Sequence, residues 1–167
     1  MSASQYQPHV LVLPEDDANR DMVIGFRLDP WLDFRQIQVE DVAGGWHEVL
    51  TLFRSEHLRK MRAIRFRFMV LLFDFDGYPE ERMEMAKGQI PDDLKERVFI
   101  LGALTEPEKL KANIGKSYEA IGKAAAQDCR EGTDTTWGHA LLKHNATEIE
   151  RLRLHVRPIL FPPLSSP

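Results

Sequence analysis

The apolar residues of this chain fall into short runs with strand-like spacing, separated by longer stretches with helical spacing. Three runs predict buried strands: residues 9–13 (HVLVL), 64–73 and 97–104. A shorter alternating segment at residues 35–39 (RQIQV) predicts a fourth strand. The run at 64–73 starts with apolar residues that alternate with arginines and then becomes apolar throughout. This pattern indicates a strand that is covered on both faces toward its end.

The stretches with helical spacing lie between the predicted strands and after the last one. They cover residues 17–28, 46–62, 79–87, 107–113, 117–129 and 137–156. Asp16 or Asp17 would cap the first helix, and Pro79 suits the first turn of the third. Strands that alternate with helices predict an α/β fold. We therefore expect a Rossmann-like, mostly parallel central sheet with flanking helices and a helical C-terminal third.

The length and composition indicate one globular domain. The chain has 167 residues, of which 43% are hydrophobic and 29% are charged, which is typical of a folded protein. We expect a flexible arm at residues 1–8, a single α/β domain at 9–161 and a tail at 162–167. Within the domain, the core motifs lie at 9–106 and the helical part at 107–157.

Charge and cysteine content limit the classes of partner and compartment. The net charge of −4 indicates no overall basic field, so a nucleic-acid substrate would need a local basic patch or bridging metal ions. Cys129 is the only cysteine, so no disulfide can form within the chain, which fits a reducing compartment. The longest apolar run of the chain, Phe68–Phe73, is too short to span a bilayer. The chain starts without the features of a signal peptide. We therefore expect a cytoplasmic protein that does not insert into a membrane.

Acidic residues follow the ends of three predicted strands. Glu15 comes after the first, Asp74 and Asp76 after the third, and Glu106 after the fourth. The carboxyl ends of parallel strands share one edge of a sheet, where ligands of α/β proteins bind. Hard cations prefer carboxylate oxygens, and carboxylates that lie close together repel one another without a cation or a proton. We therefore predict a divalent-metal site, although solvated turn residues and helix caps would have the same sequence.

The segments HVLVLPEDDAN and LLFDFDG resemble the motifs of the Toprim domain family. In that family an apolar strand ends in Glu, here Glu15, and a later strand ends in Asp-x-Asp, here Asp74 and Asp76. The family has Gly directly after the Glu and Asp four residues after it. This chain has Asp16 and Asn19 at those two positions.

The resemblance implies a Toprim-like fold and a metal-dependent nuclease. Glu15 would be the general base or a metal ligand, and Asp74 and Asp76 would hold Mg²⁺ or Mn²⁺. Small nucleases of the overcoming-lysogenization-defect type add a further acid, which Glu106 matches. Such relatives often work beside an ATPase, and some act in anti-phage defence. The chain has no Walker A motif, so an ATPase would be a separate partner.

Three other functions fit parts of the same pattern. A receiver domain would use Asp16, Asp17 and Asp74 for Mg²⁺ and phosphorylation, with Thr105 after its fourth strand, but it needs a fifth strand that ends in Lys. A haloacid-dehalogenase-like phosphatase would use the LLFDFDG aspartates, but its usual Thr is Tyr78 here. A non-catalytic binding module with the same acids is the third alternative.

Two further segments contain residues that can bind ligands. One is basic and could guide a phosphate backbone, although such runs are more often solvated: Arg59, Lys60, Arg62, Arg65 and Arg67. The other extends from Trp137 to Asn145 and includes His139, Lys143 and His144. We interpret it mainly as a helix that packs through Trp137 and its leucines.

Overall fold

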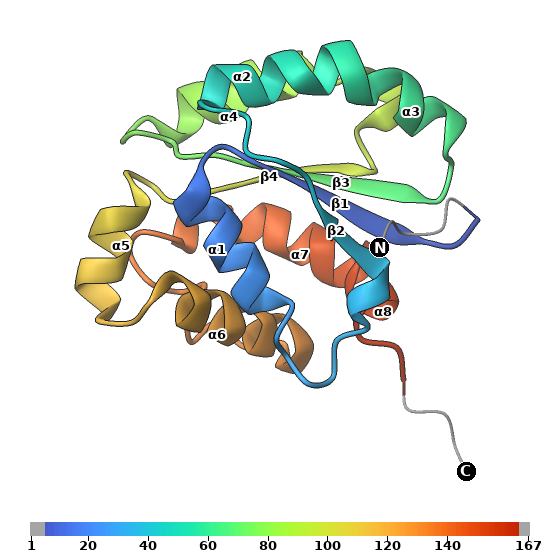
Figure 1. The fold of residues 1–167 in the computed structure, drawn as a ribbon. Helices are drawn as coiled ribbons and strands as arrows, with labels where there is room; N and C mark the ends of the chain where they lie inside the picture. The colour runs from blue at the N-terminus through green and yellow to red at the C-terminus, as the bar shows by residue number, and fades with distance from the viewer. Residues whose placement is uncertain (1–5, 164–167) are drawn as a thin grey trace.

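The computed structural model describes residues 6–163, and a four-stranded, entirely parallel sheet lies at its centre (Figure 1). The order across the sheet is β2-β1-β3-β4. The predicted α/β class is therefore confirmed. The bounds of the strands are β1 His9–Pro14, β2 Ile37–Val39, β3 Arg67–Leu72 and β4 Val98–Leu101.

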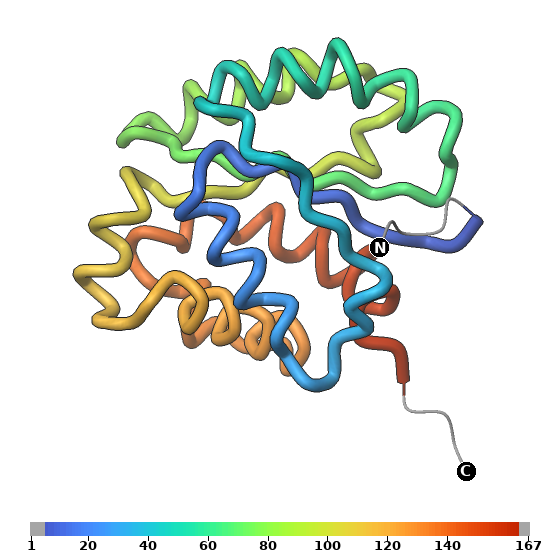
Figure 2. The backbone as a smooth tube through the Cα atoms, viewed as in Figure 1, coloured from blue at the N-terminus to red at the C-terminus, as the bar shows by residue number. Residues whose placement is uncertain are grey.

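Helices cover both faces of the sheet, as Figures 1 and 2 show. One layer contains α2 (Trp46–Leu52), the π-helical segment η2 (Phe53–His57), α3 (Leu58–Ala63) and α4 (Pro79–Gly88). The opposite layer contains α1 (Asp17–Phe26), α5 (Pro107–Ile114), α6 (Tyr118–Glu131), α7 (Ala146–His155) and α8 (Arg157–Leu160). Three short 3-10 segments are η1 (Phe34–Gln36), η3 (Asp92–Leu94) and η4 (Lys143–Asn145).

Most predicted elements are present, with differences at several of their bounds; for example, β2 begins at Ile37 and β4 ends at Leu101. The strand expected at residues 64–73 begins at Arg67, because the chain first turns after α3 through a hydrogen bond from the Arg67 amide to the Ile64 carbonyl. The prediction of a helix at 137–156 was wrong for the first part of this range. The Asp128 carboxylate accepts hydrogen bonds from the Trp137 amide and its neighbour, which holds that segment in turns, and α7 begins at Ala146.

Alternation along β1 explains why the two layers form. Leu11 and Leu13 belong to the core cluster beneath α2, α3 and α4, whereas Val10 and Val12 belong to the cluster beneath α7 and α8. All four side chains are at most 3% exposed. Successive strand residues point to opposite faces, so a run without polar residues requires cover on both sides.

Side chains from the C-terminal helices close the outer edge of β4. The buried carboxylate of Glu148 accepts a hydrogen bond from the Ile100 amide at 3.3 Å, and it pairs with Arg151. The buried Asn145 amide accepts from the Gly102 amide at 3.2 Å and donates to the Gly102 carbonyl at 2.9 Å. These side chains satisfy edge groups of the strand that would otherwise remain open to another strand.

Helices α1 and α6 approach each other at two glycines. A Cβ atom on Gly25 would lie 1.9 Å from the Glu119 carbonyl oxygen, and one on Gly122 would lie 1.8 Å from the Met22 carbonyl oxygen. Neither position has room for a side chain. The close contact of α1 and α6 therefore depends on both glycines.

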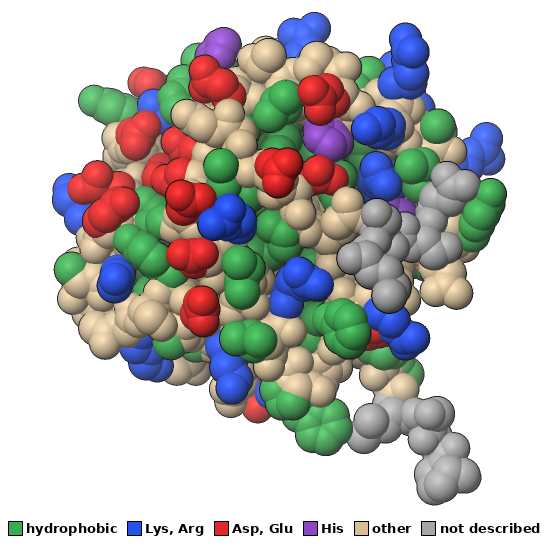
Figure 3. Space-filling view, viewed as in Figure 1, with side chains coloured by type: hydrophobic (Ala, Val, Ile, Leu, Met, Phe, Trp, Pro, Cys, Tyr) green, Lys and Arg blue, Asp and Glu red, His purple; other side chains and the backbone are tan. Residues whose placement is uncertain are grey.

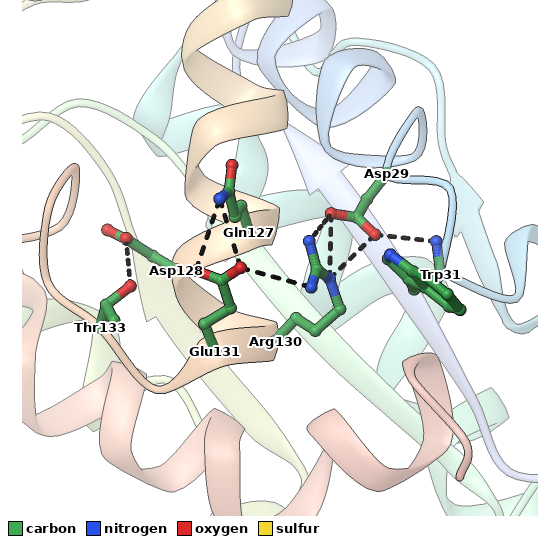
Figure 4. Close-up of polar contacts among 7 residues, drawn as sticks. All are labelled: Asp29, Trp31, Gln127, Asp128, Arg130, Glu131 and Thr133. Carbon is green, nitrogen blue, oxygen red and sulfur yellow. Dashed lines mark hydrogen bonds and ion pairs between the residues drawn. The ribbon is translucent and has the colours of Figure 1, made fainter. Parts of the chain in front are cut away.

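Polar contacts fix the two segments that follow these helices (Figure 4). Asp29, which is 4% exposed, accepts hydrogen bonds from the Trp31 amide at 2.9 Å and from the Arg130 guanidinium of α6 at 3.2 Å. At the end of α6, Asp128 accepts from the Thr133 hydroxyl at 2.7 Å. The segment that follows α1 is thus joined to α6 by an ion pair, which a buried carboxylate requires.

Gly122→Ala should lower the free energy of unfolding by about 2–3 kcal/mol, because the added methyl group must push α1 away from α6. Urea denaturation followed by circular dichroism measures this change. Gly88→Ala is the matched control, since no atom lies within 4 Å of its added Cβ, and it should be neutral or slightly stabilising. Equal stability of the two variants would contradict the close packing of these helices.

Candidate functional site

The topology places the ends of β1 and β3 at the point where the sheet changes direction. The chain moves from β1 outward to β2 and then crosses back over β1 to β3 and β4. The connecting helices change faces at the same point, since α1 lies on one face and α2, α3 and α4 on the other (Figure 1). Ligands bind in the crevice that this reversal opens at the carboxyl ends of the strands. Glu15 and Asp74 both lie there.

A hydrogen bond joins the ends of the two central strands. Oε2 of Glu15 accepts from the backbone N–H of Asp74 at 2.7 Å, and the Glu15 amide donates to the Leu72 carbonyl at 2.9 Å. The sequence prediction that these two acids lie together is therefore supported by the fold. Acidic side chains also gather on the surface around the strand ends and the start of α1, on the left in Figure 3.

Asn19 contacts the buried carboxylate of Asp74 directly. Asp74 is 7% exposed and Asn19 is fully buried. Asn19 Nδ2 lies 3.4 Å from Asp74 Oδ1 and 3.0 Å from Asp16 Oδ1. Asp16 also caps α1 by accepting from the Asn19 amide at 2.9 Å. The Asn19 Oδ1 atom is buried and has no hydrogen-bond partner within the described part of the chain.

Burial and charge crowding make this site unfavourable for ionised acids. Burial, and then the charges of Glu15 and Asp16, raises the pKa of Asp74 to about 8. Burial also raises the pKa of the Glu15 carboxyl, against the effect of its hydrogen bond from the Asp74 amide. Both shifts indicate a place where added positive charge would be stabilised.

Asp76 turns away from Asp74 and pairs with an arginine. Its φ of 48° is left-handed, and Gly77 follows with a φ of 80°, so the chain reverses sharply after β3. Aspartate and glycine tolerate this conformation better than other residues. The turn brings Asp76 Oδ2 within 2.8 Å of Nη1 of Arg82 in α4. The sequence prediction placed Asp76 correctly at the strand end, but it did not foresee this ion pair.

Glu106 lies at the same edge of the sheet without joining the other acids. The carbonyl of the preceding residue, Thr105, accepts a hydrogen bond from the Asp76 amide at 3.3 Å. The Glu106 side chain is exposed at the start of α5, and no hydrogen bond or ion pair links it to the other three acids within residues 6–163. Glu106 is thus a neighbour of the site rather than part of its polar network.

The residues present fit a cation site that is only partly assembled. Within the described residues, no three His, Cys, Asp or Glu side chains converge into a set that could hold a metal ion. Glu15 and Asp74 nevertheless supply carboxylate oxygens in a place whose acids have raised pKa values. Mg²⁺ commonly takes one or two protein carboxylates and completes its shell with water and phosphate. The donor chemistry therefore fits a cation of this class.

The other two segments considered from the sequence lie outside the polar network of the site. The basic residues of 59–67 extend from α3 through the turn that follows it to the first residue of β3. This is the end of the strand opposite to Asp74. Trp137 packs against the core and donates from Nε1 to the Ala125 carbonyl at 3.1 Å. Nε2 of His144 lies 2.8 Å from the Gly102 carbonyl oxygen, and its side chain is half-buried. The packing interpretation of Trp137 is therefore confirmed.

Comparisons with protein-family models, with curated proteins and with solved structures found no match to this chain. Within residues 6–163, no helix is both long and apolar enough to cross a bilayer. The same residues contain four strands and no fifth, and the chain beyond Glu106 is helical or turned. The receiver-domain alternative therefore lacks the strand that would carry its lysine.

Asp74→Asn should stabilise the protein at neutral and alkaline pH. The folded-state pKa of Asp74 lies near 8, above the unfolded value of about 3.9, so the folded state binds the proton more tightly. Asp74 therefore contributes most stability below pH 4, and this contribution is lost as the pH rises through 8. We expect Asp74→Asn to gain about 2 kcal/mol at pH 8, a value discounted for solvent and ions at the open edge, and nothing at pH 4.

Urea denaturation in EDTA between pH 4 and pH 8.5 measures this difference. Asp93→Asn is the control, because the Arg62 side chain lowers the pKa of Asp93 instead. That carboxylate adds stability above its unfolded pKa. Asp93→Asn should therefore have a slightly lower free energy of unfolding than the wild type at neutral pH, with no further change up to pH 8.5. A difference between Asp74→Asn and the wild type that does not grow with pH would contradict the raised pKa.

Proposed function

We propose that this protein is a divalent-metal-dependent nuclease that hydrolyses phosphodiester bonds of nucleic acid. The observation that carries the proposal is the meeting of Glu15 and Asp74 at the switch point of the sheet, where the Asp74 amide binds Oε2 of Glu15 at 2.7 Å. The resemblance to the Toprim motifs supports the same assignment. It also suggests a separate ATPase partner and a role in anti-phage defence.

Glu15 and Asp74 are the residues that would hold Mg²⁺ or Mn²⁺. When bound, such a cation activates water and stabilises charge on phosphoryl oxygens. Asp76 and Glu106 are further candidate ligands from the same edge of the sheet. Asn19 keeps the Asp74 carboxylate in place through its 3.4 Å contact, which is how an amide supports a ligand at a position where the Toprim motif has Asp.

Glu15 has one carboxylate oxygen committed to the chain and one available. Oε2 accepts from the Asp74 amide, whereas Oε1 has no hydrogen bond among the described residues. Burial raises the pKa of this carboxyl, which makes the carboxylate a stronger base than an exposed one. The arrangement therefore allows Glu15 to orient a water molecule or accept its proton while the Asp74 amide fixes its position.

The proposal is tested by nuclease assays with Mg²⁺ or Mn²⁺ on single- and double-stranded DNA and RNA. Glu15→Gln and Asp74→Asn should each lower the cleavage rate by at least about 100-fold, because each removes charge from the cation site and keeps the side-chain shape. EDTA should abolish cleavage. Asp93→Asn, purified in the same way, should retain the wild-type rate.

A shift in melting temperature tests cation binding separately from cleavage. A cation that binds only the folded state stabilises it in proportion to the logarithm of its concentration. Mn²⁺ should therefore raise the melting temperature of the wild type and of Asp93→Asn, but not that of Asp74→Asn. Cleavage that survives both Glu15→Gln and Asp74→Asn would refute the assignment of these residues.

A further inference from the structure

The positively charged side chain of Arg82 contacts the acidic site, and its position is fixed from two sides. Nη1 donates to Asp76 Oδ2 at 2.8 Å and to the Asp74 carbonyl at 3.3 Å. The guanidinium carbon lies 3.9 Å from the centre of the Trp46 ring. The Arg82 side chain is only 16% exposed, whereas that of Asp76 is 50% exposed. A flat guanidinium held on an aromatic ring is a preorganised group.

The hydrogen-bonding capacity of Arg82 is only partly used. A guanidinium has five N–H donors in a fixed fork. Both bonds to the chain come from Nη1, and within residues 6–163 neither Nε nor Nη2 has a hydrogen-bond partner. Neither atom is a buried group without a partner, so both face accessible space. Such an open fork matches the oxygens of a phosphate group.

The Arg82–Asp76 ion pair keeps Asp76 away from the pair formed by Glu15 and Asp74. Asp76 sits two residues after Asp74, yet its left-handed backbone directs its carboxylate to α4. The same pairing holds Asp76 on the outer side of this acidic site. A phosphate that takes the guanidinium would release Asp76, and a cation that takes Asp76 would release the guanidinium.

We propose that Arg82 and Asp76 form a latch that couples phosphate binding at Arg82 to the binding of a cation by Asp76 together with Asp74 and Glu15. This inference rests on the proposed function and assigns Arg82 as the residue that binds a backbone phosphate of the nucleic acid. Each ligand takes one partner of the ion pair, so each binds more tightly when the other is present. Coupling of this kind is reciprocal by thermodynamic necessity.

Mn²⁺ binding measured by electron paramagnetic resonance tests the latch without any need for cleavage. Sulfate is the probe for the phosphate site, since it has the same oxygen geometry. In the wild type, sulfate should tighten Mn²⁺ binding by about fivefold, at the low end of ordinary coupling. Arg82→Gln should bind Mn²⁺ about fivefold more tightly without sulfate, and sulfate should have no further effect.

A second substitution separates the latch from the simple loss of a positive charge. If the gain in Arg82→Gln comes from the released Asp76 carboxylate, adding Asp76→Asn should abolish it, and the two substitutions will be non-additive. A gain that persists with Asp76→Asn would come from charge removal alone and would overturn the latch. Arg82→Lys, which keeps the charge but loses the fork and the stacking, should lie between the wild type and Arg82→Gln.

Arg62→Gln is the matched control, because Arg62 also pairs with an aspartate, Asp93, at 2.9 Å but away from the site. It should bind Mn²⁺ as the wild type does. Binding that depends on Asp74 but is unchanged or weaker in Arg82→Gln would overturn the latch and leave the proposed function intact. Absence of Mn²⁺ binding to the wild type would overturn the proposed function itself, and the latch with it.

Discussion

The six-residue parallel pairing of β1 with β3 positions both the core and the site. Its register runs from His9 beside Arg67 to Pro14 beside Leu72, so both strands leave the sheet at the same level. The next contact along this line is the bond from the Asp74 amide to the Glu15 carboxylate. A slip of one residue would exchange the two faces of β1 and separate the acids. Core packing therefore holds the two carboxylates together.

The site is costly for the folded state. Burial and neighbouring charges raise the pKa of Asp74 to about 8. The adjacent Arg82 forms its ion pair with Asp76, so the carboxylate of Asp74 has no such partner among the described residues. A sheet covered on both faces can tolerate this cost, because the apolar residues of β1 and the middle of β3 (Met69, Val70 and Leu71) are almost completely buried. Residues that oppose stability in this way are common at binding and catalytic sites.

Local patterns predicted the strands and the place of the acids but not the direction of every side chain. Glu15 and Asp74 could be placed together because both follow apolar strands in a parallel sheet. The pairing of Asp76 with Arg82 depends on a left-handed turn and on the packing of α4, which no spacing reveals. The signal for Asn19 was its place four residues after Glu15, although its contact with Asp74 requires the tertiary structure.

The closed edge of β4 has a consequence for how the chain reaches this structure. The groups that complete the strand, Asn145 and Glu148, come more than forty residues after it in the sequence. Before α7 docks, alternate amides of β4 can pair with a strand of another copy, which is a route to aggregation. Docking of α7 thus competes with self-association during folding. The C-terminal third therefore protects the edge of the sheet from pairing with another chain, in addition to covering the core.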